Sequence, residues 1–279
     1  MRIVVTGASG QLGHDLVDNL RHDNEVFPFD LDLDITDAGA VDEKIVEIKP
    51  DAVINAAAYT DVDGCELHPD LALKVNADGA ENLSLACRKT GAIMVHVSTD
   101  FVFDGNKKQP YTEDDKTNPI NMYGRSKLVG EEHVRSLLSS YYIVRTAWLF
   151  GMHGANFVKS IIRSADEKGE LAVVTDQAGS PTYSRDLAEK IAELMKSGFF
   201  GLYHITNAGI CSWFEFAEAI LAKSGRGHVK IRPITSGELD RPAIRPAYSV
   251  LKNGQLEKRG IPLLRPYEEA LEAYFKESV

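Results

Sequence analysis

The sequence lacks the features that would place it in a membrane or outside the cell. No apolar run approaches the roughly 20 residues that a membrane-spanning helix needs, and the run at residues 3–5 is too short for a signal-peptide core. The three cysteines, Cys65, Cys87 and Cys211, are odd in number, widely spaced and without a Cys-x-x-Cys pair. We therefore expect buried free thiols, a reducing cytoplasmic location and no membrane contact.

Positive charge is also scarce, because 31 lysines and arginines face 41 aspartates and glutamates and the net charge is −10. No basic cluster occurs, so nucleic acid is not an expected partner, although a few local arginines could still bind an anionic small molecule. The 279 residues, of which 44% are apolar, allow one large domain or two smaller ones with an ample core.

Short apolar runs alternate with amphipathic runs along the first three-quarters of the chain. The pattern predicts strands at residues 2–6, 25–29, 52–57, 93–98, 142–147, 171–175 and 202–206. It predicts helices at residues 11–21, 41–48, 71–89, 123–138, 156–168 and 184–196. This order favours an α/β fold, a Rossmann-type doubly wound parallel sheet with helices on both faces.

Beyond residue 207 the alternation fades, and residues 213–223 and 267–276 are the expected helices. We expect this tail to form a smaller C-terminal α/β substrate lobe over the carboxyl edge of the sheet, where ligands bind in such folds. The predicted dinucleotide-binding domain is residues 1–149 with about 185–206. The predicted substrate-binding lobe is about 150–184 with 207–279.

A glycine-rich turn, Gly7-Ala-Ser-Gly10-Gln-Leu-Gly13, joins the first predicted strand to the first predicted helix. Glycines let the backbone turn tightly there and approach a pyrophosphate at the amino end of the helix. The spacing departs from Gly-x-Gly-x-x-Gly, and any tight strand-to-helix turn would use glycine. Its place before a second strand that ends in Asp30 nevertheless favours a dinucleotide site.

Asp30 follows the turn at about the distance at which a carboxylate binds the adenosine ribose hydroxyls. It would repel a 2′-phosphate and so favours NADH over NADPH, whereas the competing interpretation is a solvated acid at the end of a strand. Asn76 could support the wall of the same groove or cap its own helix. We expect the cofactor, NADPH or NADH, to be bound by Gly7, Gly10, Gln11, Leu12, Gly13, Asp30, Asp34, Ile35, Ala57, Ala58, Tyr59, Thr60, Asn76, Tyr123 and Lys127.

Tyr123 and Lys127 are four residues apart and share one face of a predicted helix. A free tyrosine is a poor acid near neutral pH, and a lysine charge beside it would stabilise the phenolate and lower its pKa. The pair therefore suits general acid catalysis by Tyr123. The same spacing also arises by chance in helix surface pairs, and the glycine turn upstream strengthens the catalytic interpretation.

These motifs resemble those of the extended short-chain dehydrogenase/reductases, and within them the dTDP-4-dehydrorhamnose reductases. The matching stretches are Thr6-Gly-Ala-Ser-Gly-Gln-Leu-Gly13, Asn55-Ala-Ala-Ala-Tyr-Thr60, Val97-Ser-Thr-Asp-Phe-Val-Phe-Asp-Gly105, Asn121-Met-Tyr-Gly-Arg-Ser-Lys127, Arg145-Thr-Ala-Trp148 and Asp176-Gln-Ala-Gly-Ser-Pro-Thr182. The resemblance implies reduction of the C4 keto group of a nucleotide sugar, dTDP-4-dehydro-L-rhamnose, by NADPH or NADH. Tyr123 is then the proton donor.

By the same resemblance, Lys127 also binds the nicotinamide ribose, and Thr99 donates a hydrogen bond to the reacting oxygen. Ser98 is the neighbouring competitor for that role, and Thr99 could instead be an ordinary strand residue or a helix cap. The implied contacts to the nucleotide sugar are Thr99, Asp100, Trp148 and Arg245. Trp148 could equally be a core residue and Arg245 a member of a surface ion pair.

Some members of this family pair through a magnesium ion held by glutamates, and the matching positions here are Asp15 and Arg185. Arginine cannot ligate a metal, so we expect no metal and leave a monomer or a homodimer open. Two other functions stay open. One is a non-catalytic NADP-binding regulatory subunit, like that of methionine adenosyltransferase, and the other is a reductase or epimerase of another nucleotide sugar.

Overall fold

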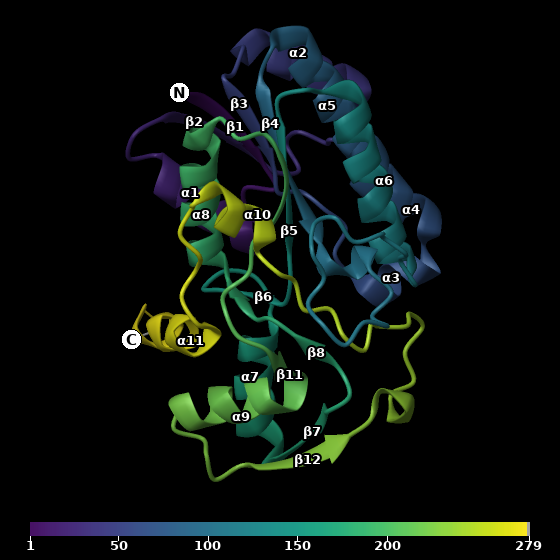
Figure 1. Ribbon diagram of the computed structural model, residues 1–279, viewed down its shortest axis with the longest axis vertical. Helices are drawn as coiled ribbons and strands as arrows, with labels where there is room; N and C mark the ends of the chain where they lie inside the picture. The colour runs from purple at the N-terminus through teal and green to yellow at the C-terminus, as the bar shows by residue number, and fades with distance from the viewer. Residues whose placement is uncertain (278–279) are drawn as a thin grey trace.

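The computed structural model describes residues 1–277 of the chain. Within them a six-stranded parallel sheet, in the order β10-β5-β4-β3-β1-β2, forms the centre of the fold (Figure 1). In chain order its strands are β1 (Arg2–Thr6), β2 (Glu25–Phe29), β3 (Ala52–Asn55), β4 (Ile93–Thr99), β5 (Tyr141–Thr146) and β10 (Gly201–His204). The order reverses at β1, where β2 lies on one side and β3 on the other, and ligands bind at such a switch point.

Helices cover both faces of this sheet, so the expected Rossmann-type α/β fold is confirmed (Figure 1). One layer consists of α1 (Gln11–Leu20) and α8 (Ser184–Ser197). The other layer consists of α2 (Ala38–Ile48), α5 (Gly79–Thr90) and α6 (Met122–Leu137). Leucines at helical spacing on α1, Leu12, Leu16 and Leu20, join the core on the first face.

The segment expected as one helix over residues 71–89 is divided, and that expectation is wrong in detail. It consists of α4 (Pro69–Leu73), a π-helical turn η1 (Lys74–Asp78) and then α5. A shorter helix that the sequence pattern did not predict, α3 (Val62–Leu67), precedes it. π-helical turns are rare and often lie at functional sites, and this one carries the buried Asn76.

A smaller group of elements lies beyond the carboxyl ends of the sheet strands (Figure 1). Its strands pair as β6 (Leu149–Phe150) with β9 (Thr182–Tyr183), β7 (Glu170–Val174) with β12 (Lys230–Ile234), and β8 (Ala178–Gly179) with β11 (Cys211–Ser212). Its helices are α7 (Phe157–Lys168), α9 (Trp213–Lys223), η3 (Ser236–Glu238) and α11 (Tyr267–Glu277). In contrast, α10 (Gly254–Arg259) packs against β10 of the large sheet, where Leu256 joins the core. This arrangement supports the division into a dinucleotide-binding domain and a substrate lobe, which remains a prediction.

The two outer strands of the large sheet carry groups that hinder further strand pairing. Pro28 lies in β2 and has no backbone N–H to offer at that edge. At the opposite edge, the backbone N–H of His204 in β10 donates to the carboxylate of Glu113 over 3.2 Å. Among residues 1–277, no helix is long and apolar enough to cross a membrane.

A buried ion pair fixes α6 to the sheet. Arg145 of β5 and Glu131 of α6 have side chains that are 1% and 0% exposed, and Nε and Nη2 of the arginine each lie 2.7 Å from a carboxylate oxygen. Ser98 of β4 donates to the same carboxylate over 2.7 Å. Because the desolvated charges are paired and hydrogen-bonded, the contact holds the helix against two neighbouring strands.

Removing Glu131 tests how much the fold depends on this contact. Glu131→Ala would leave the Arg145 charge buried without its partner, and we expect a loss of about 3–5 kcal/mol in the free energy of unfolding. Arg135→Ala is the matched control, because Arg135 binds the same carboxylate from the surface with a side chain that is 39% exposed. In urea denaturation, Arg135→Ala should lower the free energy of unfolding by about 1 kcal/mol or less. Equal losses in the two variants would contradict the assignment.

Candidate active site

A cavity of about 880 Å³ opens at the carboxyl ends of the central strands. It runs from the turn after β1 and the end of β2 to the end of β4 and the start of α6. The expected site residues that line it are Gly7, Gly10, Gln11, Leu12, Gly13, Asp30, Asp34, Ile35, Ala57, Ala58, Thr60, Thr99, Asp100, Tyr123, Lys127 and Trp148. Tyr59, Asn76 and Arg245 are outside this lining.

The glycine turn has the geometry that a pyrophosphate site needs. Gly7 has a left-handed backbone with φ of 68°, and a Cβ there would lie 2.6 Å from the backbone nitrogen of Ala57. A Cβ on Gly13 would overlap the carbonyl oxygen of Gly7, so α1 packs directly on the turn. α1 begins after Gly10 without a side-chain cap, which leaves backbone N–H groups of its first turn to face an anion. These residues fit NADPH or NADH.

The acidic segment after β2 forms one end of the cavity. Asp30 is half-buried and lines the cavity, and its backbone N–H donates to the Asp32 side chain over 2.6 Å. Asp34 accepts the backbone N–H of Thr36 over 2.9 Å, and this hydrogen bond lowers the pKa of the Asp34 carboxyl. Asp30 and Asp34 therefore lie at the cavity wall, whereas Asp32 is turned toward the backbone of Asp30.

Asn76 supports the cavity wall from behind. Its Oδ1 accepts the backbone N–H of Tyr59 over 2.8 Å, and its Nδ2 donates to the Tyr59 carbonyl over 3.1 Å and to Ser126 over 3.0 Å. The π-helical turn thus ties the loop after β3 to α6, the helix of Tyr123 and Lys127. Of the two interpretations of Asn76, the structure favours wall support over a helix cap, and Tyr59 contributes its backbone to that support.

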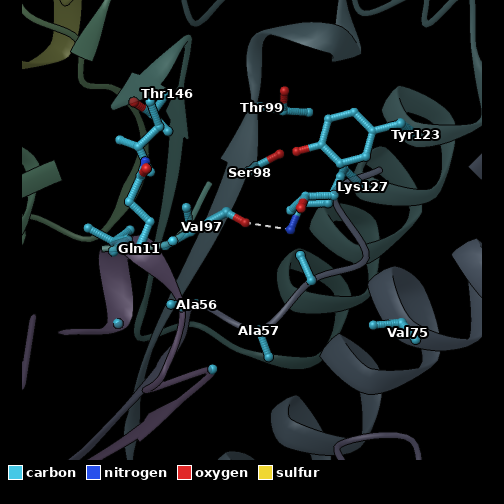
Figure 2. Close-up of a pocket in the computed structure, with 18 of the residues that line it drawn as sticks. Gln11, Ala56, Ala57, Val75, Val97, Ser98, Thr99, Tyr123, Lys127 and Thr146 are labelled. Carbon is cyan, nitrogen blue, oxygen red and sulfur yellow. Dashed lines mark hydrogen bonds between the residues drawn. The ribbon is translucent and has the colours of Figure 1, made fainter. Parts of the chain in front are cut away.

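Tyr123 and Lys127 lie in the first two turns of α6 and face the end of β4 (Figure 2). Asn121 caps the start of the helix, and its side chain accepts the backbone N–H of Gly124 over 2.9 Å. A Cβ on Gly124 would overlap the carbonyl oxygen of Phe101, so only glycine allows this close approach of α6 to the short segment that follows β4. The ammonium of Lys127 donates to the carbonyl oxygen of Val97 over 2.6 Å, as Figure 2 shows.

Burial dominates the protonation of both groups. It raises the pKa of Tyr123, a hydrogen bond with Thr99 opposes this, and the nearby Asp100 charge adds to it. It lowers the pKa of Lys127 to about 8, which the Glu131 charge partly opposes. The sequence predicts that Lys127 lowers the pKa of Tyr123, but the pKa of Tyr123 is raised instead. The Lys127 ammonium binds the carbonyl of Val97, and the cost of desolvating the phenolate prevails. Tyr123 therefore remains protonated at neutral pH.

Thr99, rather than Ser98, is associated with Tyr123. Ser98 donates its hydroxyl to Glu131, whereas Thr99 donates to Asp100 over 3.1 Å and accepts the backbone N–H of Phe101 over 3.2 Å. Thr99 thus also caps the short helix η2 (Asp100–Val102), as its alternative interpretation anticipated. Burial raises the pKa of Asp100 to about 7, so its carboxyl changes charge near neutral pH.

Arg245 lies outside the cavity lining and is paired. Its two terminal nitrogens donate to the two carboxylate oxygens of Asp63 over 2.6 and 2.7 Å, and its side chain is 12% exposed. Asn121 donates to the carbonyl oxygen of the neighbouring Ile244 over 2.8 Å. The segment around Arg245 is therefore tied to α3 and to the start of α6, and the diphosphate contact of Arg245 remains a prediction.

The two positions matched to the family's magnesium site are engaged with other groups. Asp15 accepts a hydrogen bond from Ser184, and Arg185 forms an ion pair with Glu277 over 2.8 Å. The part of the chain that the structure describes contains no group of three or more His, Cys, Asp or Glu residues that could hold a metal. One lining residue that the sequence did not indicate is Trp213, the first residue of α9.

The sheet is parallel and doubly wound, an uncapped glycine turn lies at its switch point, and the helix with the Tyr-x-x-x-Lys pair packs beside β4. Together these features define an extended short-chain dehydrogenase/reductase. Comparison with known proteins narrows the class. The family described as RmlD substrate binding domain matches residues 1–279. The chain is 42% identical over 282 residues to the dTDP-4-dehydrorhamnose reductase of Streptomyces griseus, covering 98% of this chain and 93% of that protein.

A second relative and a solved structure point to the same family. The chain is 43% identical over 278 residues to the spore coat polysaccharide biosynthesis protein SpsK of Bacillus subtilis, covering 99% of this chain and 97% of the relative. It is similar to the crystal structure of dTDP-4-dehydrorhamnose reductase from Bacillus anthracis in complex with NADP, with a TM-score of 0.97, 43% identity and 99% coverage of both chains. The chain belongs to the dTDP-4-dehydrorhamnose reductase family.

The place of Asp30 in the cavity leads to a prediction about cofactor preference. We expect the protein to use NADH as well as NADPH, because a carboxylate at the ribose disfavours a 2′-phosphate. Asp30→Ala should shift the ratio of kcat/KM for NADPH over NADH toward NADPH by roughly tenfold, as loss of one partly screened charge repulsion allows. Asp32→Ala is the matched control. The same ratio in both variants would mean that Asp30 does not face the ribose.

Proposed function

We propose that this protein reduces the C4 keto group of dTDP-4-dehydro-L-rhamnose to give dTDP-L-rhamnose, with NADPH or NADH as reductant. The observation that carries the proposal is the close placement of Tyr123, Thr99 and Lys127 at one end of a dinucleotide cavity, in a chain of this family. A non-catalytic cofactor-binding subunit would not need a protonated phenol at that point. The presence of all three residues therefore favours an enzyme over a non-catalytic subunit.

Bound NADPH or NADH supplies the hydride that the carbonyl carbon accepts. Negative charge then develops on the carbonyl oxygen, and Tyr123 donates its proton to it. A phenol with a raised pKa can still do this, because the alkoxide of a secondary alcohol is a far stronger base than a phenolate. Proton donation leaves Tyr123 as a phenolate, which must take up a proton from solvent before the next turnover, and the raised pKa of Tyr123 favours this uptake.

Lys127 and Thr99 stabilise the charge on the reacting oxygen and orient the bound molecules. The Lys127 ammonium places a positive charge at the end of the cavity where the alkoxide would develop, and it would bind the ribose of the nicotinamide cofactor. Thr99 lies beside Tyr123 and offers a second hydroxyl to the reacting oxygen. In this structure the Thr99 hydroxyl donates to Asp100, and it would turn from Asp100 to the substrate oxygen.

An anionic substrate needs a local cation in this acidic protein. Arg241 and Arg245 lie close enough for the Arg245 charge, together with burial, to lower the pKa of Arg241, and both act on Asp63. Two guanidinium groups around one carboxylate leave a net positive charge. We place the diphosphate of the nucleotide sugar beside this cluster, where an arginine fork suits phosphate oxygens.

The cellular setting and the assembly are further parts of the proposal. The thiols of Cys65, Cys87 and Cys211 are free and buried in the described part of the chain, which supports a reducing compartment such as the cytoplasm. A monomer and a homodimer both remain open. Sedimentation of the purified protein with and without its cofactor distinguishes them.

The direct test is oxidation of NADPH by the purified protein in the presence of dTDP-4-dehydro-L-rhamnose. The expected product is heavier by two hydrogen atoms and co-elutes with dTDP-L-rhamnose. No turnover with this substrate or with any other 4-keto nucleotide sugar, despite NADPH binding, would support the regulatory-subunit alternative. Reduced or oxidised cofactor that stays bound through purification would support the epimerase alternative.

Replacing Tyr123 by phenylalanine tests the proton donor. Tyr123→Phe keeps the ring and removes the hydroxyl, so NADPH affinity should stay near that of the wild type while kcat falls by about 10²-fold or more. Ser98→Ala is a useful control, because Ser98 is bound to Glu131 and should not donate to the substrate. Wild-type turnover in Tyr123→Phe would exclude this residue as the acid.

The pH dependence of the reaction follows from Lys127. Its pKa of about 8 means that the ammonium is present below this pH and is lost as the pH rises through it. We expect kcat/KM to fall above about pH 8, by up to tenfold per pH unit, while Tyr123 remains protonated throughout. Lys127→Arg keeps the positive charge at all these values, so its lower activity should lack the alkaline fall. A flat wild-type profile to about pH 10 would contradict the role of the ammonium.

A further inference from the structure

Residues 151–156, which we call the strap, connect β6 to α7 and lie against the first turns of α1. The ring of His153 stacks on the ring of His14, with centroids 4.1 Å apart and planes 19° apart. A Cβ on Gly154 would lie 3.6 Å from the Cβ of Gln11, so nothing separates these two residues. The strap therefore touches the helix that begins at the glycine turn, although the two are far apart in the sequence.

The strap also belongs to the rim of the cavity. Gly154 and Ala155 line the cavity together with Gly10 and Gln11 of the glycine turn. Both strap residues are exposed, so this part of the cavity lies next to solvent. A phosphate group bound at the uncapped start of α1 would lie beside them.

The strap is folded onto the first turn of α7. The Lys159 ammonium donates to the carbonyl oxygens of Met152 and Gly154 over 2.7 and 3.0 Å. Asn156 accepts the backbone N–H of Lys159 with its Oδ1 over 3.1 Å and so caps α7. Its Nδ2 donates to the carbonyl oxygen of Gly151 over 2.8 Å. We therefore expect the strap and the start of α7 to move as one unit.

One further hydrogen bond joins this unit to the glycine turn. Nδ2 of Asn156 also donates to Oε1 of Gln11 over 2.9 Å. The capping bond requires the oxygen of the Asn156 amide, so the nitrogen end must face Gln11. Both side chains are half-buried, and water therefore competes only partly for this hydrogen bond.

We infer that Asn156 is a positioning residue of the cofactor site. Through Gln11 it fastens the strap to the glycine turn, and the fastened strap slows the release of the dinucleotide. The inference rests on the proposed function in one respect only, that NADPH or NADH is bound. Opening of a loop at the rim of a site often limits the release of a bound molecule. Here opening requires the hydrogen bond between Asn156 and Gln11 to break.

The test measures the dissociation of NADPH by stopped flow. The protein is loaded with NADPH and chased with excess NADP+, and the change in NADPH fluorescence gives the dissociation rate. Asn156→Ser keeps a good cap for α7, but the serine side chain is too short to reach Gln11. We expect the dissociation rate to rise about fivefold, the scale for loss of one neutral hydrogen bond. Asn156 is outside the cavity lining, so the association rate should stay unchanged. An unchanged dissociation rate overturns the inference.

Gln11→Ala removes the same hydrogen bond from the other side. In this background, Asn156→Ser should raise the dissociation rate by less than about twofold, because the bond that it would break is already lost. Full and independent effects of the two substitutions would mean that Asn156 does not act through Gln11, and the inference would be wrong.

Ser160→Ala is the matched control. Ser160 lies in the same first turn of α7, where its backbone N–H donates to the Asn156 carbonyl over 3.0 Å, and it is outside the cavity lining. Its dissociation rate should equal that of the wild type, and a rise equal to that of Asn156→Ser overturns the inference. A wild type that binds neither NADPH nor NADH contradicts both the proposed function and the inference. A wild type that binds NADPH, with no change in the Asn156 variant, contradicts only the role of Asn156.

Discussion

The contact between Glu131 and Arg145 is the constraint on which the geometry of the site depends. Glu131, Lys127 and Tyr123 follow one another at four-residue intervals, so they form one stripe along α6 that faces the sheet. The ion pair fixes the carboxyl-terminal end of this stripe, at Glu131, to β5. Ser98 fixes the same end to β4. Rotation of the helix would break a pair that has no water to replace it. The phenol and the ammonium are therefore held in register with the strand end by a contact that takes no part in the chemistry.

The amino-terminal end of α6 is held by close backbone packing rather than by charge. Gly124 allows the helix to touch the carbonyl of Phe101, and Asn121 caps the helix while binding the segment at Ile244. Asn76 adds a third link, between the cofactor wall and Ser126. The loop after β3, the π-helical turn and the segment at Ile244 thus meet at the first two turns of α6. This arrangement brings segments from three distant parts of the sequence to one end of the cavity.

Much of this arrangement is predictable from the sequence, because parallel strands and their covering helices leave strong periodic patterns. The six strands of the sheet, the glycine turn and the Tyr123–Lys127 face all follow from such local signals. The π-helical turn at Lys74–Asp78 does not, since one extra residue in a turn hardly alters an apolar pattern. The two-residue strands β6, β8, β9 and β11 are too short to be periodic. The link between Asn156 and Gln11 and the Asp63 partner of Arg245 are long-range contacts, which no local pattern encodes.

The outer strands of the sheet have a consequence for how copies of this protein can meet. Pro28 removes a donor from the β2 edge, and the carboxylate of Glu113 occupies the His204 donor at the β10 edge. An open edge is a template on which a second chain can add a strand, and both edges are obstructed here. If this protein forms a homodimer, its interface must therefore be made of side chains on helices or on the lobe. Such an interface can be tuned or lost by surface substitutions while the folded subunit remains intact.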